Sequence, residues 1–228
     1  MFTPINRLFV ETQENNRIVF YNAEKPVYFE KYKNDVAKYA NLFSKIQNDT
    51  VVMYIPDDLY FFYVCFMAAL QAGKDIILPA LFTVQNSKSL LEMTNVLITD
   101  KFDSFGDFNI INLECPDNHD WEFNDVSDRF LYFFTSGSTG TPKRIKKQFK
   151  MLAAEVAFHS QNQKHLIEQN PVSISSVAPY HMYGLLWRFF FPLANNIIAD
   201  LDIVFTPEEL QHKQSIYDKV LFATTPSF

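Results

Sequence analysis

The sequence contains little glycine and cysteine. Only 5 of its 228 residues are glycine and 2 are cysteine, whereas phenylalanine occurs 24 times. Cys65 and Cys115 are too far apart for metal-ligand spacing, so they predict no metal site, and Cys65 lies in an apolar segment where a buried thiol is inert. Because glycines are scarce, the positions of those that remain are informative.

Long hydrophobic runs are also absent. The most apolar stretch, residues 59–70, is shorter than the roughly 20 residues that a membrane-spanning helix needs. Aspartates precede it and Gly73 follows it, which favours a buried helix. The first ten residues lack the apolar core of a secretory signal. We therefore expect a cytoplasmic protein without a membrane span.

Acidic residues outnumber basic residues in the sequence. The chain has 20 Lys and Arg against 26 Asp and Glu, which gives a net charge of −6. This balance argues against nucleic acid as the main partner, because binding many phosphates requires a large positive surface. It leaves a local nucleotide site possible. The hydrophobic share of 48% is ordinary for a globular protein.

Short apolar runs alternate with helical patterns along the chain. Alternating strands and helices predict an α/β fold with layered, mainly parallel sheets flanked by helices. Helices are expected where apolar residues recur at helical spacing, with a cap at Asp57 or Asp58 in one case and the start Thr206-Pro207-Glu208-Glu209 in another. The expected strands are residues 51–55, 75–78, 96–99, 110–113, 130–134, 172–177, 203–205 and 220–223, and the expected helices cover 32–46, 59–70, 149–166 and the segment after 206.

The end of the sequence follows an apolar run, 220–223, with only five further residues. A parallel strand normally continues into a crossover connection. We therefore expect that the chain stops within a βα unit, as a fragment would.

One segment carries a chemical signal. The apolar run 130–134 leads directly into Thr135, Ser136, Gly137, Ser138, Thr139, Gly140, Thr141, Pro142 and Lys143. Glycines allow the backbone to approach a ligand closely, and successive N–H groups in such a turn form an anion-binding concavity. The hydroxyl groups add neutral donors and Lys143 adds a positive charge. Together these groups suit a polyphosphate.

Three other interpretations of this loop compete. A P-loop requires G-x-x-x-x-G-K-[ST], but Thr141-Pro142 separates Gly140 from Lys143. A dinucleotide fingerprint requires G-x-G-x-x-G, which is also absent. A plain Ser- and Gly-rich turn is the simplest alternative, and the particular order S-G-S-T-G-x-P-K after an apolar strand argues against it.

The loop resembles the signature phosphate loop of the adenylate-forming superfamily, which includes acyl-CoA synthetases, carrier-protein-loading adenylation domains and luciferases. Further segments agree in the family's order. Residues 51–56, 68–73 and 76–79 resemble an early family region, and 178–185, Ala-Pro-Tyr-His-Met-Tyr-Gly-Leu, resembles a motif beside the acyl pocket. Residues 206–227 resemble the helix and strand that lead to the family's "P-T/S" turn. The resemblance covers nearly the whole chain.

The resemblance implies a fold and a reaction. The fold is the large N-terminal domain of these enzymes, incomplete here, with a first subdomain over 1–170 and the start of a second over 171–228. The reaction joins a carboxylate to AMP from Mg²⁺-bound ATP and then passes the acyl group to a thiol, either CoA or the phosphopantetheine arm of an acyl carrier protein. Thr135 to Gly140 would hold the phosphates, and Lys143 would be catalytic. Tyr180, His181 and Gly184 would belong to the substrate pocket.

The sequence departs from the family in two ways. The family usually has glycine after Pro-Lys, whereas Arg144 follows here, a pattern more like a bacterial subgroup that loads aromatic or fatty acids onto carrier proteins. Family motifs for adenine, ribose and Mg²⁺, and a late lysine, are absent from this chain. The chain alone is therefore expected to be inactive. The alternative is a short homologue that binds nucleotide or a partner without catalysis.

Several polar residues have simpler interpretations. A lone histidine such as His181 is often structural, and the surrounding Pro-Tyr-His-x-x-Gly pattern favours a pocket position equally. His159 and His165 are spaced wrongly for a shared metal site. The basic run 143–150 could contact phosphate or a carrier protein, and a solvated helix start is the plainer interpretation.

Overall fold

The computed structural model describes residues 2–11, 14–79, 82, 84–101, 105–114, 119–135 and 143–225. The chain divides into two compact units, which are described separately. The central unit is Lys33–Lys150, and the terminal unit combines Met1–Tyr32 with Met151–Phe228.

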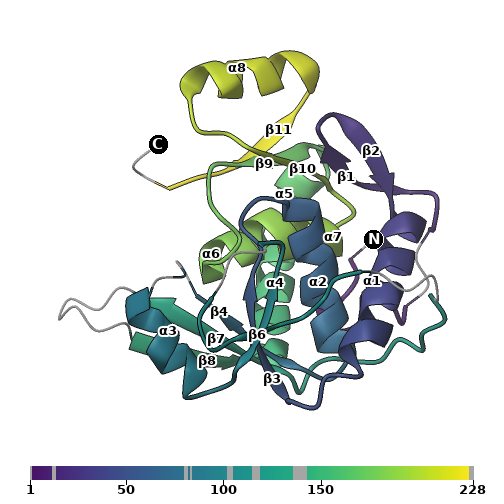
Figure 1. Ribbon diagram of the computed structural model, residues 1–228. Coiled ribbons are helices and arrows are strands. Elements are labelled where there is room, and N and C mark those ends of the chain that lie inside the picture. The colour runs from purple at the N-terminus through teal and green to yellow at the C-terminus, as the bar shows by residue number, and fades with distance from the viewer. Residues whose placement is uncertain are drawn as a thin grey trace. The chain divides into compact units, whose positions relative to one another are not determined.

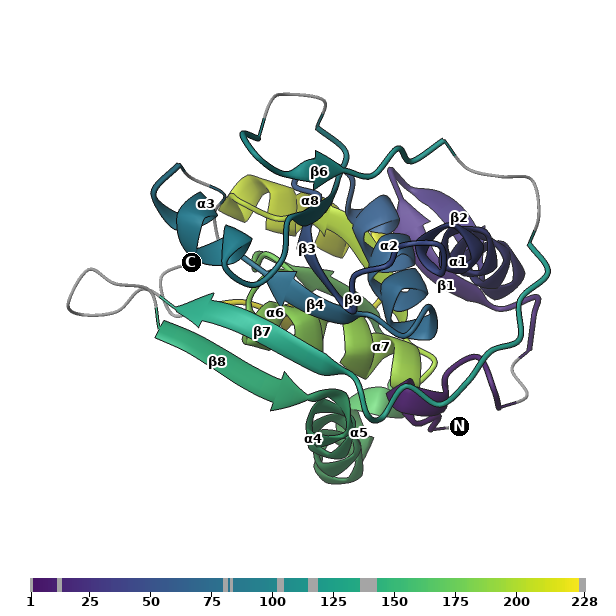
Figure 2. The ribbon, with the colours of Figure 1, turned by 60° about the horizontal axis from the view of Figure 1, so that its bottom comes forward.

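The central unit is built on a six-stranded sheet with the order β6-β5-β3-β4-β7-β8. All neighbours are parallel except β7 and β8, which form an antiparallel pair at one edge (Figure 2). The apolar runs of β3, β4 and β5 are almost fully buried, as parallel strands covered on both faces are. The strands are β3 (Thr50–Tyr54), β4 (Asp75–Leu78), β5 (Val96–Thr99), β6 (Asn109–Ile110), β7 (Phe130–Thr135) and β8 (Lys143–Gln148).

Helices supply the rest of the central core. In α2 (Leu59–Gln71), the Asp58 carboxylate accepts a hydrogen bond from the Phe61 N–H at 2.9 Å and caps the helix start, as expected. This helix is apolar on all sides and is buried from Phe62 to Gln71, including Cys65. On one face of the sheet, Leu90 of α3 (Val84–Leu91) packs in one cluster with Val52, Ile77, Leu97 and Phe108. The remaining helix, α1 (Phe29–Phe43), crosses the boundary between the units.

The terminal unit is built on a five-stranded sheet with the order β11-β9-β10-β1-β2 (Figure 1). It is parallel except for the β1–β2 hairpin. Its strands are β1 (Ile18–Asn22), β2 (Lys25–Tyr28), β9 (Val172–Ser175), β10 (Ile198–Ile203) and β11 (Val220–Ala223). Its helices are the 3-10 turn η1 (Ile5–Arg7), α4 (Phe149–Asn162), α5 (Lys164–Ile167), α6 (Met182–Gly184), the π-helix η2 (Leu185–Phe190), α7 (Phe191–Ala194) and α8 (Pro207–Ile216).

The start of α8 matches the expectation from the sequence. The Thr206 side chain accepts a hydrogen bond from the Glu209 N–H at 3.2 Å, and the Glu209 carboxylate accepts from the Thr206 N–H at 3.1 Å. Pro207 occupies the first turn, where its missing N–H is not needed. This reciprocal capping box fixes the helix boundary.

Several expected elements differ from those observed. Strand β1, near the N-terminus, was not expected, and it pairs with β10 in the same sheet as β9 and β11. The run 143–148 forms strand β8, and the helix begins only at Phe149. Strand β10 begins at Ile198, well before the expected 203–205. The expected helix 149–166 is divided into α4 and α5.

Candidate functional site

The expected phosphate loop lies in the sequence between β7 and β8, the antiparallel pair at one edge of the central sheet. Thr135 and Lys143 are paired across the β7–β8 ladder. Because β7 is parallel to β4, Thr135 at the end of β7 lies at the carboxyl edge of the sheet, where ligands of parallel α/β sheets bind. Residues Ser136, Gly137, Ser138, Thr139 and Gly140 and the side chains of Thr135 and Lys143 lie outside the described part of the chain.

The base of this hairpin is anchored to the neighbouring strand β4. The Arg129 guanidinium donates to the Gly73 carbonyl at 2.6 Å, and the Phe130 N–H donates to the Asp75 carboxylate at 2.9 Å. Gly73 has a φ of +77°, a conformation that favours glycine. At the same end of the hairpin, where Phe130 pairs with Gln148, the Gln148 side chain donates to the Asp128 carboxylate at 3.1 Å. These bonds fix the end of the hairpin that is opposite to the Thr135–Lys143 pair.

The basic run lies on the edge strand. The Lys146 ammonium lies 3.8 Å from the centre of the Phe130 ring and 5.4 Å from that of Tyr132, so its charge rests on aromatic faces of β7. Arg144 and Lys150 are exposed. Charged side chains on an edge strand hinder pairing with other chains, which gives the run a structural role besides any contact with phosphate.

The second candidate region is residues 178–187 in the terminal unit. His181 is exposed and occupies the N-cap position of α6, where its carbonyl accepts a hydrogen bond from the Leu185 N–H at 2.9 Å. Tyr180 is half-buried. Gly184 is buried, and a Cβ atom there would lie 2.0 Å from the Ala178 carbonyl oxygen. The close approach of the Ala178 backbone therefore requires glycine at position 184.

A pocket of about 160 Å³ opens beside this region. Tyr183 and Trp187 form one part of its lining, and residues 221–223 of β11 form the other. The Tyr183 hydroxyl donates to the Thr224 carbonyl at 3.3 Å, which links the two parts. Tyr180, His181 and Gly184 are not among its lining residues, so their place in a substrate pocket remains a prediction. The apolar run of β11 and the aromatic residues Tyr183 and Trp187 were the available signals for this lining.

Buried polar contacts hold the pocket walls. Arg188 of η2 is 1% exposed, and its guanidinium donates to the carbonyls of Val177 at 2.9 Å and Leu201 at 2.6 Å. The Ser175 hydroxyl donates to the Ala223 carbonyl at 3.0 Å. The Arg188 bonds join η2 to β10 and to the segment after β9, and the Ser175 bond joins the carboxyl ends of β9 and β11. A π-helix such as η2 is frequent at functional sites.

The described residues contain neither a metal-binding cluster nor a membrane-spanning helix. Within the described ranges, His, Cys, Asp and Glu side chains form no cluster of three that could hold a metal ion. No helix of the described part of the chain combines the length and apolar character needed to cross a membrane.

Comparisons with known proteins match the fold. No protein-family model and no curated protein matches the sequence. ATP-bound MatB from Rhodopseudomonas palustris is similar in structure, with a TM-score of 0.79 and 15% identity over 94% of this chain and 48% of that one. O-succinylbenzoate CoA synthetase (MenE) from Bacillus subtilis, in complex with AMP, gives a TM-score of 0.74 and 15% identity over 91% of this chain and 57% of that one. MenE in complex with the acyl-adenylate intermediate OSB-AMP gives a TM-score of 0.75 and 15% identity over 97% of this chain and 62% of that one.

The chain thus spans roughly half to three fifths of the length of these structures, 48% of MatB and 62% of the OSB-AMP complex of MenE. Because the identity is only 15%, the structural similarity establishes a common fold and no more. The expected layers of mostly parallel sheet and helices are confirmed, and the chain shares this fold with MatB and MenE.

Proposed function

We propose that the chain is the N-terminal portion of an ATP-dependent carboxylate–AMP ligase. The observation that carries this proposal is the position of the S-G-S-T-G-x-P-K sequence. In the sequence it follows Thr135, the last residue of β7, and ends at Lys143, the first residue of β8, and these two residues are paired at the carboxyl edge of a parallel sheet in a chain that shares its fold with ATP-bound MatB. Similar structures contain ATP, ATP with magnesium, or an acyl-adenylate, which supports ATP and Mg²⁺ as ligands.

The loop residues would act on the phosphates. In this proposal the donors of Thr135 to Gly140 hold the β- and γ-phosphates of ATP while a carboxylate attacks the α-phosphate. Lys143 stabilises the negative charge of the leaving pyrophosphate. Positioning and fixed charges dominate such reactions, and in this proposal the pairing of Thr135 with Lys143 holds the two ends of the loop together. Mg²⁺, when bound with ATP, would neutralise phosphate charge.

The carboxylic acid would bind in the terminal unit. Tyr180, His181 and Gly184 keep their proposed place near the acid, and the aromatic pocket at Tyr183 and Trp187 would hold its apolar part. The acceptor of the acyl group would be a thiol, either free CoA or the phosphopantetheine of an acyl carrier protein. The similarity to an o-succinylbenzoate CoA synthetase supports CoA as one candidate.

The proposal predicts a specific loss when Lys143 is removed. In a complete enzyme that contains this chain, Lys143→Ala should slow ATP–pyrophosphate exchange by roughly 10²-fold, the effect of losing one preorganised charge donor. Lys150→Ala removes an exposed lysine from the same basic run and serves as the control. An exchange rate that is unchanged in Lys143→Ala, or lowered equally in both variants, would remove Lys143 from the mechanism.

A second expectation concerns the 228-residue chain alone. It should not convert ATP and a carboxylic acid into acyl-AMP, because no adenine, ribose or Mg²⁺ ligand could be assigned within it. Incubation with a panel of aromatic and fatty acids, followed by mass spectrometry for acyl-AMP, tests this. Detection of acyl-AMP would contradict the expectation. Nucleotide binding without exchange, in a complete protein as well, would instead support the non-catalytic homologue.

A further inference from the structure

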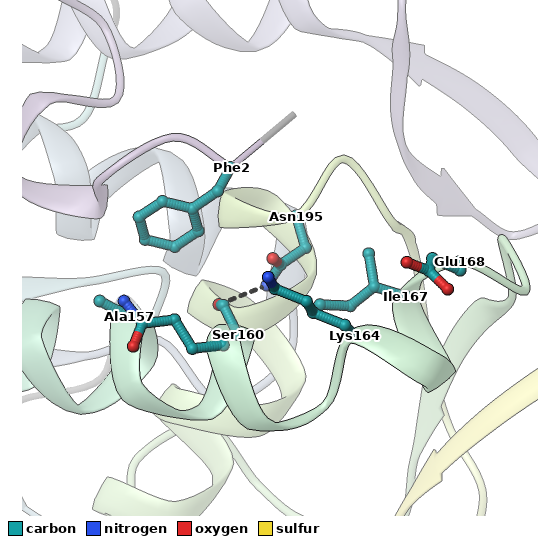
Figure 3. Close-up of a pocket in the computed structure, with 8 residues that line it drawn as sticks. Phe2, Ala157, Ser160, Lys164, Ile167, Glu168 and Asn195 are labelled. Carbon is teal, nitrogen blue, oxygen red and sulfur yellow. Dashed lines mark hydrogen bonds between the residues drawn. The ribbon is translucent and has the colours of Figure 1, made fainter.

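A second and larger pocket lies in the terminal unit, with a lining distinct from that of the Tyr183 pocket. Its volume is about 390 Å³, within the range of roughly 300–1,000 Å³ typical of small-molecule sites. The C-terminal half of α4, the short helix α5, the N-terminal segment and the end of α7 supply its walls (Figure 3). Its apolar lining comes from Phe2, Ala157 and Ile167.

The floor of this pocket offers acceptors. Ser160 and Asn195 are 6% and 7% exposed. The Asn195 Nδ2 atom donates to Ser160 Oγ and to the Phe191 carbonyl, each at 2.8 Å, and the Ser160 hydroxyl donates to the Val156 carbonyl at 2.8 Å. All donors of the two side chains are therefore used. The remaining polar atom of the Asn195 amide, Oδ1, is an acceptor, so the floor suits a ligand group that donates hydrogen bonds.

The rim carries one charge of each sign. Lys164 begins α5 and Glu168 ends it, and both are exposed pocket-lining residues. In the described part of the chain, neither forms an ion pair with the other or with a third residue. A ligand with both an ammonium and a carboxylate group would complement this rim and the acceptor floor together.

From these features we infer that the pocket binds an apolar α-amino acid. Its ammonium group donates to Asn195 Oδ1 and is attracted by Glu168, and its carboxylate faces Lys164. Its side chain replaces water against Phe2, Ala157 and Ile167, which stabilises binding through burial of apolar surface. The site does not involve the phosphate loop, so this inference does not depend on the proposed ligase function.

Calorimetric titration of the 228-residue chain with L-phenylalanine tests the inference, with 2-phenylethylamine and 3-phenylpropanoate as probes that lack one charge each. Saturable binding of phenylalanine is expected, with at least about tenfold weaker binding of either analogue. Lys164→Gln should weaken the binding of phenylalanine and leave the binding of 2-phenylethylamine unchanged. Equal binding of phenylalanine and either analogue would overturn the assignment to amino acids.

A matched pair of variants locates the site. Ala157→Phe fills the pocket from α4, whereas Ala154→Phe adds the same ring at an exposed position of the same helix. Phenylalanine binding should be lost in the first and kept in the second. Glu168→Gln, which adds no volume, should weaken binding even if Ala157→Phe does not fold. Absence of saturable binding to the unmodified chain, or equal binding by both Phe variants, would overturn the proposal.

Discussion

Gly184→Ala should lower the free energy of unfolding by about 3 kcal/mol, the upper end of the usual cost of overpacking. The φ and ψ of Gly184, −65° and −42°, suit any residue, so the cost comes from space alone. An added Cβ would meet the Ala178 carbonyl oxygen at 2.0 Å, and that oxygen belongs to the backbone and cannot rotate away. Denaturant unfolding of the variant and the unmodified chain measures the difference.

Two controls separate the cause of this effect. Gly184→Ser introduces the same Cβ and should cost as much. His181→Ala changes an exposed side chain that makes no capping hydrogen bond, so it should change stability by less than about 0.5 kcal/mol. If Gly184→Ala also changes the free energy of unfolding by less than about 0.5 kcal/mol, the close approach of the Ala178 carbonyl does not constrain residue 184. In a complete enzyme, a raised KM for the acid in His181→Ala would support its proposed place in the pocket.

The second large effect is expected at Lys213 on α8. Its ammonium lies 2.7 Å from carboxylate oxygens of both Asp200 and Asp202 of β10. The side chain of Asp200 is 0% exposed and also accepts a hydrogen bond from the Tyr217 hydroxyl at 2.8 Å. Lys213→Ala would leave this carboxylate buried without a cation, which typically costs about 3 kcal/mol or more. The double variant Lys213→Met, Asp200→Asn has no buried charge at position 200. It should therefore lower the free energy of unfolding by less than Lys213→Ala does in the same measurement.

The same cluster predicts a dependence of stability on alkaline pH. Burial lowers the pKa of Lys213, but the hydrogen bonds to Asp200 and Asp202 outweigh it and raise the pKa above its ordinary value. Burial, and then the bond to Asp200, raise the pKa of Tyr217. Both groups therefore hold their protons more tightly in the folded state. Their contribution is complete below the unfolded pKa values of roughly 10 to 10.4 and is lost as pH rises above them.

Unfolding midpoints between neutral pH and pH 11 would show this loss. The unmodified chain should lose stability above roughly pH 10, where unfolded tyrosine and lysine release protons. The Lys213→Met, Asp200→Asn variant should lose less over the same interval. Parallel curves for the two proteins would show that other groups cause the alkaline loss.

Strand β10 shows why some elements could not be predicted from the sequence. Its residues Asp200 and Asp202 interrupt the apolar pattern that marks a buried strand. They are tolerated because Lys213 and Tyr217, from a later part of the chain, supply a cation and a hydroxyl donor. A buried charge is acceptable only with such partners, and partners brought by tertiary structure leave no local signal.

Strand β8 and the β1–β2 hairpin make the same point. The lysine-rich run 143–148 has low strand propensity, yet it pairs along its whole length with β7 and rests Lys146 on the rings of β7. The β1–β2 turn places Ala23 and Glu24 at φ of 48° and 62°, where Asn or Gly is the usual signal. Pairing within the sheets overrides both local preferences.

The sequence by itself determined the elements that depend on local chemistry. The apolar runs of β4, β5 and β11 were assigned to their observed residues, and the caps at Asp58 and Thr206 lie where expected. The order of residues 135–143 predicts a phosphate loop, and this stays a prediction. Only the tertiary structure decided which distant segments meet, such as β1 with β10, the lining at Tyr183 with β11, and Ser160 with Asn195. Such contacts depend on the packing of whole elements, because no single segment contains the residues that stabilise it.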